Sequence, residues 1–279
     1  MTTELADKTI LVTGTTSGMG NYIATELAGR GATLLIHGRD QAKLERTAQD
    51  IQRKTGNNHI RMYLADFASL RSVKDMGDAI AAAEPKLDVL INNAGIGGGR
   101  PFSGREISQD GYELRFAVNY LAPYVLTHTL LSLMKKSAPS RIVNVASAGQ
   151  QPIDFANVML EQGYGQARAY MQSKLAIIMM TFDLADELVG TSVTVNALHP
   201  ATFMNTKMVR QSFIPPTSTV RSGAEPTIRL AIAPELQGIT GRYFDQTHES
   251  HANSQAYDHV AREELRMITE RLVQEAIRK

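Results

Sequence analysis

The stretch Thr9-Ile10-Leu11-Val12-Thr13-Gly14-Thr15-Thr16-Ser17-Gly18-Met19-Gly20 decides the fold of this 279-residue chain. A short β-branched run leads into a glycine-rich turn, and residues 22–28 then have helical periodicity. Glycines let a backbone approach a pyrophosphate, and free N–H groups at a helix N-terminus favour its charge. The stretch therefore predicts a strand, a helix and, between them, a phosphate-binding turn made of Gly14, Thr16, Ser17, Gly18, Met19 and Gly20. The alternative is a tight connection without a ligand, because the spacing G-x-x-x-G-x-G differs from the commonest dinucleotide fingerprint.

A second apolar run, residues 31–39, predicts a strand that closes a first βαβ unit. Dinucleotide-binding folds often place an acid after this strand, where it binds the ribose hydroxyls. Here Gly38 and Arg39 follow instead. A guanidinium binds a 2′-phosphate through forked, charge-assisted contacts, whereas an acid repels it. We therefore expect NADP(H) to be preferred, with NAD(H) possible if Arg39 only opens the following loop. We interpret His37 as a satisfied strand-end residue.

Four more runs predict strands whose carboxyl ends carry small or polar residues. In open parallel sheets, ligands bind outside these ends. Asp66 is placed to accept from an adenine amino group or to cap the next helix, and both roles are compatible. The small residues after the next strand let the chain pass close beneath a cofactor. The residues concerned are Asp66 with Phe67 after 60–65, Asn93, Ala94 and Gly95 after 87–91, Ser147 after 141–146, and Pro200 with Thr202 after 191–198.

Composition excludes several classes of protein. Net charge is +1, and the basic residues are mixed with acids, which argues against a nucleic-acid partner. There is no cysteine, so thiolate catalysis and cysteine-ligated metals are excluded. His248 and His251 lack an obvious third ligand, so we expect no metal site. No apolar run is long enough to span a membrane and the N-terminus is no secretory signal, so we expect a cytoplasmic protein.

Tyr170 and Lys174 lie four residues apart, at the start of an apolar run that predicts a buried helix. This spacing places both side chains on one helix face. A phenol is a poor base at neutral pH, but a nearby ammonium lowers its pKa and equips it to exchange a proton with an alcohol or carbonyl oxygen. Taken alone, the pair is compatible with an ordinary tyrosine beside a solvated lysine. Asn119 lies inside a long helix predicted from Gln109 to Lys136, where asparagine indicates a distortion or a polar partner such as Lys174.

As an ordered set, these residues resemble the short-chain dehydrogenases/reductases over about residues 8–245. The set comprises the glycine-rich turn, Asp66, Asn92-Asn93-Ala94-Gly95, Asn119, Ser147, the Tyr170/Lys174 pair and Pro200. The resemblance implies an α/β fold, a Rossmann-like doubly wound parallel sheet of about seven strands with helices on both faces. It also implies hydride transfer between NAD(P) and a carbonyl or alcohol substrate.

The same resemblance implies a role for each site residue. Tyr170 would be the general acid/base, and Lys174 would lower its pKa and bind the nicotinamide ribose. Ser147 would hydrogen-bond the substrate oxygen, and Asn119 would hold a water that links Lys174 to solvent. Family members commonly assemble through the helices that carry Asn119 and Tyr170, so a homodimer or homotetramer is expected. One departure is Pro200-Ala201 in place of the usual Pro-Gly, which leaves Thr202 and Thr206 as alternative cofactor contacts.

Three segments complete the expected single domain of residues 1–279. A surface insertion at about 148–169 forms a substrate-side loop, and its length resembles the subgroup that includes retinol dehydrogenases. An aperiodic segment at about 203–223 predicts a lid, and the tail from Asp258 predicts an amphipathic helix. An apolar substrate is expected from a set of apolar or aromatic residues near the site: Phe155, Met159, Tyr164, Phe203, Met204 and Met208. The alternatives are an NAD-linked dehydrogenase and a regulator that senses NADPH without turnover.

Overall fold

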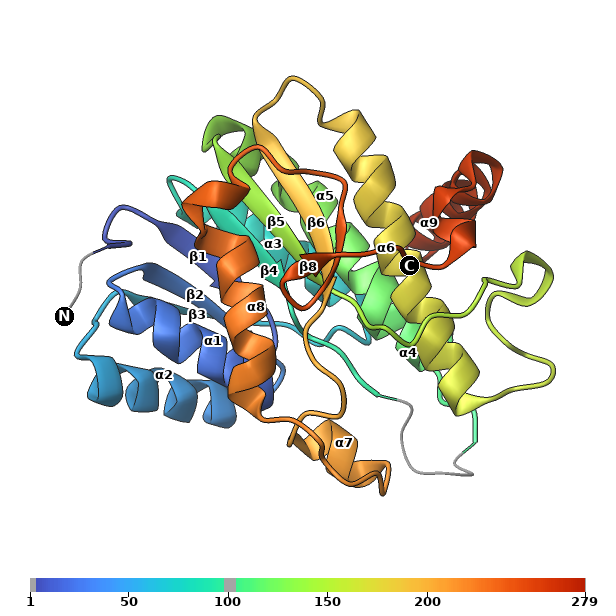
Figure 1. Cartoon of the computed structure of the whole chain (residues 1–279), viewed down its shortest axis with the longest axis horizontal. Coiled ribbons are helices and arrows are strands. Elements are labelled where there is room, and N and C mark those ends of the chain that lie inside the picture. The colour runs from blue at the N-terminus through green and yellow to red at the C-terminus, as the bar shows by residue number, and fades with distance from the viewer. Residues whose placement is uncertain (1–3, 98–103, 279) are drawn as a thin grey trace.

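A computed structural model gives the architecture and describes residues 4–97 and 104–278 (Figure 1). One eight-stranded sheet runs through it in the order β3-β2-β1-β4-β5-β6-β7-β8, and all neighbouring pairs are parallel except β7 and β8. The predicted parallel sheet is confirmed, with an additional short antiparallel strand at its edge. The strands are β1 (Thr9–Val12), β2 (Thr33–Gly38), β3 (Ile60–Leu64), β4 (Val89–Asn92), β5 (Ser140–Val145), β6 (Val193–His199), β7 (Tyr243–Asp245) and β8 (His248–Glu249).

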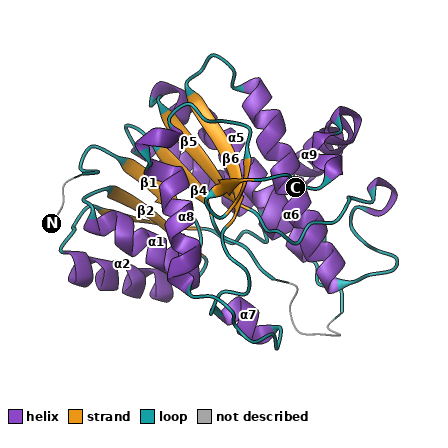
Figure 2. Cartoon of the chain, viewed as in Figure 1, coloured by secondary structure: helices purple, strands orange, loops and turns teal. Residues whose placement is uncertain are grey.

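Helices cover both faces of the sheet (Figure 2). One apolar core joins the sheet to α1, α2 and α8, and the other joins it to α3, α5, α6 and α9. Central strands such as β1 and β4 are buried along their whole length because they are covered on both sides. The helices are α1 (Gly18–Gly29), α2 (Gln41–Thr55), α3 (Leu70–Ala83), α4 (Leu114–Phe116), α5 (Ala122–Lys136), α6 (Gln166–Glu187), α7 (Lys207–Gln211), α8 (Val220–Ile232) and α9 (His259–Arg278).

The long helix predicted from Gln109 begins later, at Leu114. Glu113 caps it, since its carboxylate accepts a hydrogen bond from the Phe116 N–H at 2.8 Å. Residues before it form a turn in which Gly111 has a φ of +88°. The helix is also interrupted by a π-helical segment at Ala117–Leu121, between α4 and α5. Asn119 lies inside that segment, so the predicted distortion at this asparagine is confirmed.

The predicted lid contains more helix than its sequence suggests. It includes α7, and α8 begins inside it at Val220, because Thr219 caps α8 by accepting from the Ser222 N–H at 3.1 Å. Pro226 consequently lies inside α8. The tail helix α9 forms as expected and buries Leu265 and Leu272. Val260, an apolar residue near the start of this helix, is 74% exposed and does not belong to the buried face.

The substrate-side loop is partly a core element and not only a surface insertion. Ile153 and Val158 are buried in the core shared with α5 and α6, and Leu160 is buried as well. Gln255 lies in the short 3-10 helix at Ser254–Tyr257. Its side-chain oxygen accepts from the Ile153 N–H at 2.6 Å, and its side-chain nitrogen donates to the Ile153 carbonyl at 3.1 Å. The loop is therefore fixed to the C-terminal segment. No helix in the described ranges is long and apolar enough to cross a membrane.

Candidate active site

The glycine-rich turn packs too tightly for side chains. A Cβ on Gly20 would lie 2.3 Å from the Gly14 carbonyl oxygen and 2.4 Å from Asn93 Nδ2, and one on Gly14 would lie 2.9 Å from Ala94 Cα. Gly14 also has a φ of +72°, which favours glycine. The turn leads directly into α1, whose N-cap Ser17 has no side-chain capping hydrogen bond. The first N–H groups of α1 are therefore suited to a phosphate, which a bound dinucleotide would supply.

Thr13 and Asn93 tie this turn to the end of β4. The Thr13 hydroxyl accepts from the N–H groups of Asn93 and Ala94, at 3.0 and 2.9 Å. The Asn93 amide donates to the Thr13 carbonyl at 2.7 Å. Two of the predicted cofactor segments, Gly14–Gly20 and Asn93–Gly95, are thus one rigid unit at the carboxyl edge of the sheet.

His37 supports the same unit from β2. Its Nδ1 accepts from the Gly14 N–H at 3.1 Å, so the ring proton lies on Nε2 and is donated to the Ala65 carbonyl at 3.1 Å. Its ring stacks on Phe67 at 4.3 Å between centroids. Burial lowers the pKa of His37 to about 4, which keeps the ring neutral. The interpretation of His37 as a satisfied strand-end residue agrees with these contacts.

Gly38 and Arg39 lie where the ribose of a dinucleotide is expected. A Cβ on Gly38 would be 2.6 Å from Thr16 Cγ2, so any side chain here, an acid included, would require Thr16 to shift. Arg39 is exposed. The next residue, Asp40, is engaged elsewhere, as the N-cap of α2 and in an ion pair with Lys43 at 2.9 Å.

Asp66 follows β3 and does not cap α3. Its Oδ1 accepts from the Ala68 N–H at 3.0 Å and its Oδ2 accepts from Gln109 Nε2 at 3.0 Å. The N-cap is Ser69, whose hydroxyl accepts from the Ser72 N–H. The capping alternative is therefore wrong, because a residue three positions later fills that role. A contact of Asp66 with an adenine amino group stays a prediction.

Tyr170 and Lys174 lie on α6 beside Ser147, at the carboxyl end of β5. Lys174 Nζ lies 5.8 Å from the centre of the Tyr170 ring and donates to the Val145 carbonyl at 2.8 Å. The Ser147 side chain lies close enough to the Tyr170 phenol to act on its pKa. The Ser147 carbonyl in turn accepts from the Tyr243 hydroxyl at 3.1 Å. The three residues predicted to carry the chemistry therefore lie together.

Burial dominates the acid–base properties of this pair. It raises the pKa of Tyr170, and the Ser147 side chain acts in the opposite direction with a smaller effect. It lowers the pKa of Lys174 to about 8. The expected lowering of the Tyr170 pKa by the ammonium is therefore not what this structure favours. Desolvation of the phenolate outweighs the attraction of a partly discharged amine.

Asn119 fastens the loop after β4 to the catalytic helix. Its Oδ1 accepts from the Ile96 N–H at 2.8 Å, and its Nδ2 donates to the Ile96 carbonyl and to Ser173 Oγ, both at 3.0 Å. Ser173 donates to the Tyr170 carbonyl at 2.7 Å. The polar partners of this asparagine are therefore Ile96 and Ser173, and Lys174 donates elsewhere. A water held by Asn119 for proton return stays a prediction.

The segment after β6 contacts the glycine-rich turn. Ala201 does not have a positive φ, so its Cβ is accommodated at the position where the resemblance implies glycine. The Thr202 hydroxyl pairs with His199 Nε2 at 3.0 Å. Thr206 caps α7 and lies against Gly18, where an added Cβ would be 3.5 Å from its methyl group. Both threonines remain compatible with cofactor contact.

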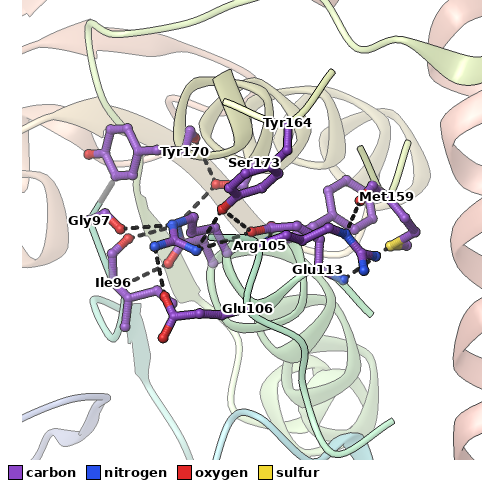
Figure 3. A network of polar contacts seen from close by, with 12 residues as sticks. Ile96, Gly97, Arg105, Glu106, Glu113, Met159, Tyr164, Tyr170 and Ser173 are labelled. Carbon is purple, nitrogen blue, oxygen red and sulfur yellow. Dashed lines mark hydrogen bonds and ion pairs between the residues drawn. The ribbon is translucent and has the colours of Figure 1, made fainter. Parts of the chain in front are cut away.

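Sequence reasoning missed a buried ionic cluster beside this site (Figure 3). Arg115 and Glu113 are each 1% exposed and pair at 3.3 Å. Tyr164, which the sequence indicated only as an apolar wall, is bonded to both. The available signal was two opposite charges at the start of an otherwise apolar helix. Within residues 4–97 and 104–278, no three histidine or carboxylate side chains gather in a way that could hold a metal ion.

Comparison with known proteins places this geometry in a family. A family model described as short chain dehydrogenase matches residues 8–215. Human retinol dehydrogenase 14 is 38% identical over 294 residues, which cover 95% of this chain and 86% of that protein. Human retinol dehydrogenase 13 is 36% identical over 285 residues, which cover 95% and 84%.

Solved structures show the same fold. A short-chain dehydrogenase from Shigella flexneri complexed with NADP aligns with a TM-score of 0.70 and 28% identity, over 88% of this chain and 99% of that one. One from Escherichia coli complexed with NADPH aligns with a TM-score of 0.71 and 29% identity, over 87% and 98%. This chain therefore belongs to the short-chain dehydrogenase/reductase family, in its retinol dehydrogenase-like subgroup, and is an oxidoreductase that acts on CH–OH or C=O groups with NAD(P).

Proposed function

We propose that this protein is an NADPH-dependent reductase of apolar carbonyl compounds, with Tyr170 as the proton donor. The observation that carries the proposal is the placement of Tyr170 next to Lys174, whose Nζ lies 5.8 Å from the centre of the Tyr170 ring, and beside Ser147 at the carboxyl edge of the sheet. Because burial raises the pKa of Tyr170, the phenol is protonated at neutral pH. A protonated phenol is suited to donate to a carbonyl oxygen as negative charge develops on it, which favours the reductive direction.

The chain's own residues divide the remaining work. A bound nicotinamide supplies the hydride. Ser147 donates a second hydrogen bond to the substrate oxygen, which stabilises the developing alkoxide. Lys174, with a pKa near 8, is a ready source of the proton that restores Tyr170. The turn from Gly14 to Gly20 would hold the pyrophosphate, and Asn93–Gly95 would lie beneath the nicotinamide end.

NADP(H) is preferred because the Arg39 guanidinium at the end of β2 is available to bind a 2′-phosphate. The exposed guanidinium has no hydrogen bond or ion pair recorded within the described ranges, while Asp40 is held by Lys43. A side chain at Gly38 would press on the Thr16 methyl group, which disfavours an acid that would bind ribose hydroxyls. The NADP and NADPH complexes of the two bacterial relatives agree with this preference.

An apolar substrate is favoured by the segment around α7. This segment exposes several large apolar side chains on the same side of the molecule as the glycine-rich turn. Exposed apolar patches of this kind mark binding surfaces. Met208 lies against Gly97, at the loop after β4. The relatives' names, which specify retinol, point to the same chemical class. The exposed residues are Phe203, Met208, Phe213 and Ile214.

The first experiment measures NADPH and NADH binding by fluorescence, in the parent and in Arg39→Ala. We expect NADPH to bind at least about tenfold more tightly, as one lost charge-assisted contact costs about 1.5–3 kcal/mol, and the substitution to remove that gap. Turnover is then followed as NADPH consumption with retinal, long-chain aldehydes and short polar aldehydes. Equal binding of both nucleotides, or turnover restricted to polar aldehydes, contradicts the respective part of the proposal. A cytoplasmic location and a homo-oligomeric state stay predictions.

A further inference from the structure

The cluster around Arg115 joins four segments of the chain beside the catalytic helix. The guanidinium donates to the Gly97 carbonyl at 3.2 Å, to Glu113 at 3.3 Å, to the Tyr164 hydroxyl at 2.9 Å and to Glu106 at 3.0 Å. Glu113 also accepts from the Tyr164 hydroxyl at 3.2 Å. Arginine presents several donors in a fixed plane, so one side chain can hold all these groups at set angles.

The position of Arg115 relative to Asn119 links the cluster to the reaction centre. The two residues lie four apart, one helical turn, and they bind consecutive residues of the loop after β4. Asn119 holds both backbone groups of Ile96, and Arg115 holds the carbonyl of Gly97. Figure 3 shows Ile96 and Gly97 in one network with Ser173 and Tyr170. A displacement of Arg115 would therefore shift Gly97 in the loop after β4, which is expected to run beneath the nicotinamide end.

The cluster also holds the substrate-side loop at two points. Tyr164 is one, and Met159 is the other, since its carbonyl accepts from Arg105 Nε at 2.8 Å and its sulfur accepts from the Glu113 N–H at 3.4 Å. Between them, Leu160 has a φ of +49°, a region that a non-glycine residue seldom occupies. Its conformation is held against local backbone preference, so external contacts must fix it.

A second cluster of the same composition shows what a purely structural role looks like. On β3, Arg61 and Tyr63 both bind Glu84, which follows α3. Glu84 is as buried as Glu113, at 1% side-chain exposure. This trio joins an edge strand to its own helix and touches no residue of the active site. The Arg115 cluster differs in that it spans the loop after β4, α4 and the substrate-side loop.

We propose that Arg115, Glu113 and Tyr164 are positioning residues that clamp the substrate-side loop against the loop after β4 and so set the affinity for the carbonyl substrate. This inference rests on the proposed reductase function. Within the described residues, the clamp does not contact the glycine-rich turn or Arg39, and its hold on the substrate-side loop runs through Tyr164. Its loss should raise the substrate KM and leave NADPH binding and the proton donor in place.

The test compares Tyr164→Phe with Tyr63→Phe, since each removes one phenol that donates to a buried glutamate. Steady-state kinetics are measured with saturating NADPH and one apolar aldehyde, alongside the NADPH Kd. We expect Tyr164→Phe to raise the aldehyde KM about tenfold, with kcat and the NADPH Kd within about twofold of the parent. Tyr63→Phe should leave all three unchanged. Equal kinetics in the two variants, or a fall in kcat at unchanged KM, overturns the proposal.

Amide hydrogen exchange over residues 150–165 provides a readout that does not need turnover. Exchange should become faster in Tyr164→Phe and stay at the parent rate in Tyr63→Phe. If the parent reduces no aldehyde, the proposed function fails while exchange still decides whether the clamp exists. Arg115→Gln removes the charge and should raise the aldehyde KM. Arg115→Lys keeps the charge without the planar fork, so we expect it to raise the KM less. Unchanged exchange in Tyr164→Phe overturns the clamp.

Discussion

The candidate site lies along the carboxyl edge of the sheet, and its two ends are built differently. Beside β1 and β2 the site consists of backbone that approaches backbone, and Gly20 admits no atom beyond its hydrogen. Beside α6 it consists of side chains that hold side chains, from Tyr170 and Lys174 to the Arg115 cluster. One added atom is enough to disrupt a close backbone contact, whereas the loss of one side-chain contact removes only what that contact contributes. Substitutions at the two ends should therefore separate binding from turnover.

The largest effect is expected at the side-chain end. Tyr170→Phe removes the donated proton and keeps the ring, so kcat should fall by about 10²–10⁴, the usual contribution of general acid catalysis. The NADPH Kd should stay within about twofold, because the glycine-rich turn is untouched. Stopped-flow kinetics and fluorescence titration on the same preparation check both. Full turnover in Tyr170→Phe would exclude this residue as the proton donor and leave the fold assignment intact.

At the backbone end, a substitution is expected to weaken NADPH binding, in contrast to the loss of kcat expected at the side-chain end. Gly20→Ala places a methyl group 2.3 Å from the Gly14 carbonyl oxygen, so the turn must open and NADPH binding should weaken at least about 100-fold. Gly29→Ala in the same helix is the matched control, because its Cβ would meet only a Thr55 methyl at 3.8 Å. Circular dichroism establishes that both variants fold. Tight NADPH binding by a folded Gly20→Ala protein contradicts the assignment of this turn to the phosphates.

The same division explains how much the sequence could predict. Backbone sites leave a compact signature, since only glycine tolerates these approaches, and the turn, the strand ends and Asn93–Gly95 are found where local pattern places them. Asn119 was found because it is out of place in a helix. Arg115 was not, because its partners Gly97 and Tyr164 are far apart in sequence and only the fold joins them. The start of α4 was missed for a related reason, as an unexpected cap at Glu113 overrode helical periodicity.

The pKa of Tyr170 shows a further limit of local reasoning. The spacing of Tyr170 and Lys174 correctly indicates one helix face, but it does not reveal how deeply that face is buried. Burial reverses the expected direction for the phenol and lowers the pKa of the Lys174 amine to about 8, because both charged forms lose hydration. Spacing alone therefore identifies the residues, while their protonation states depend on the surrounding core.

The buried amine makes stability depend on pH at the alkaline side. The folded protein releases the Lys174 proton near pH 8, whereas the unfolded chain holds it to about 10.5. The unfolded state thus binds more protons between these values, and raising the pH across them favours folding by up to about 3 kcal/mol from this group. Relative to Lys174→Met, the parent's free energy of unfolding should rise over that window in urea titrations. A pH-independent difference would mean that Lys174 is solvated in the folded protein.

His37 gives the corresponding test at the backbone end, with a smaller effect and on the acid side. Its folded pKa of about 4 lies below the ordinary value of 6.5, so the unfolded chain takes up the proton first as the pH falls. The stability that neutral His37 contributes is full above pH 6.5 and declines towards pH 4, with about 2 kcal/mol lost by pH 5. His37→Gln should show a flatter decline than the parent in the same titrations. In the folded protein, protonation of His37 near pH 4 also removes the acceptor for the Gly14 N–H, so NADPH binding by the parent should weaken as the pH approaches 4. Equal acid sensitivity of parent and variant would show that His37 does not carry the loss of stability on the acid side.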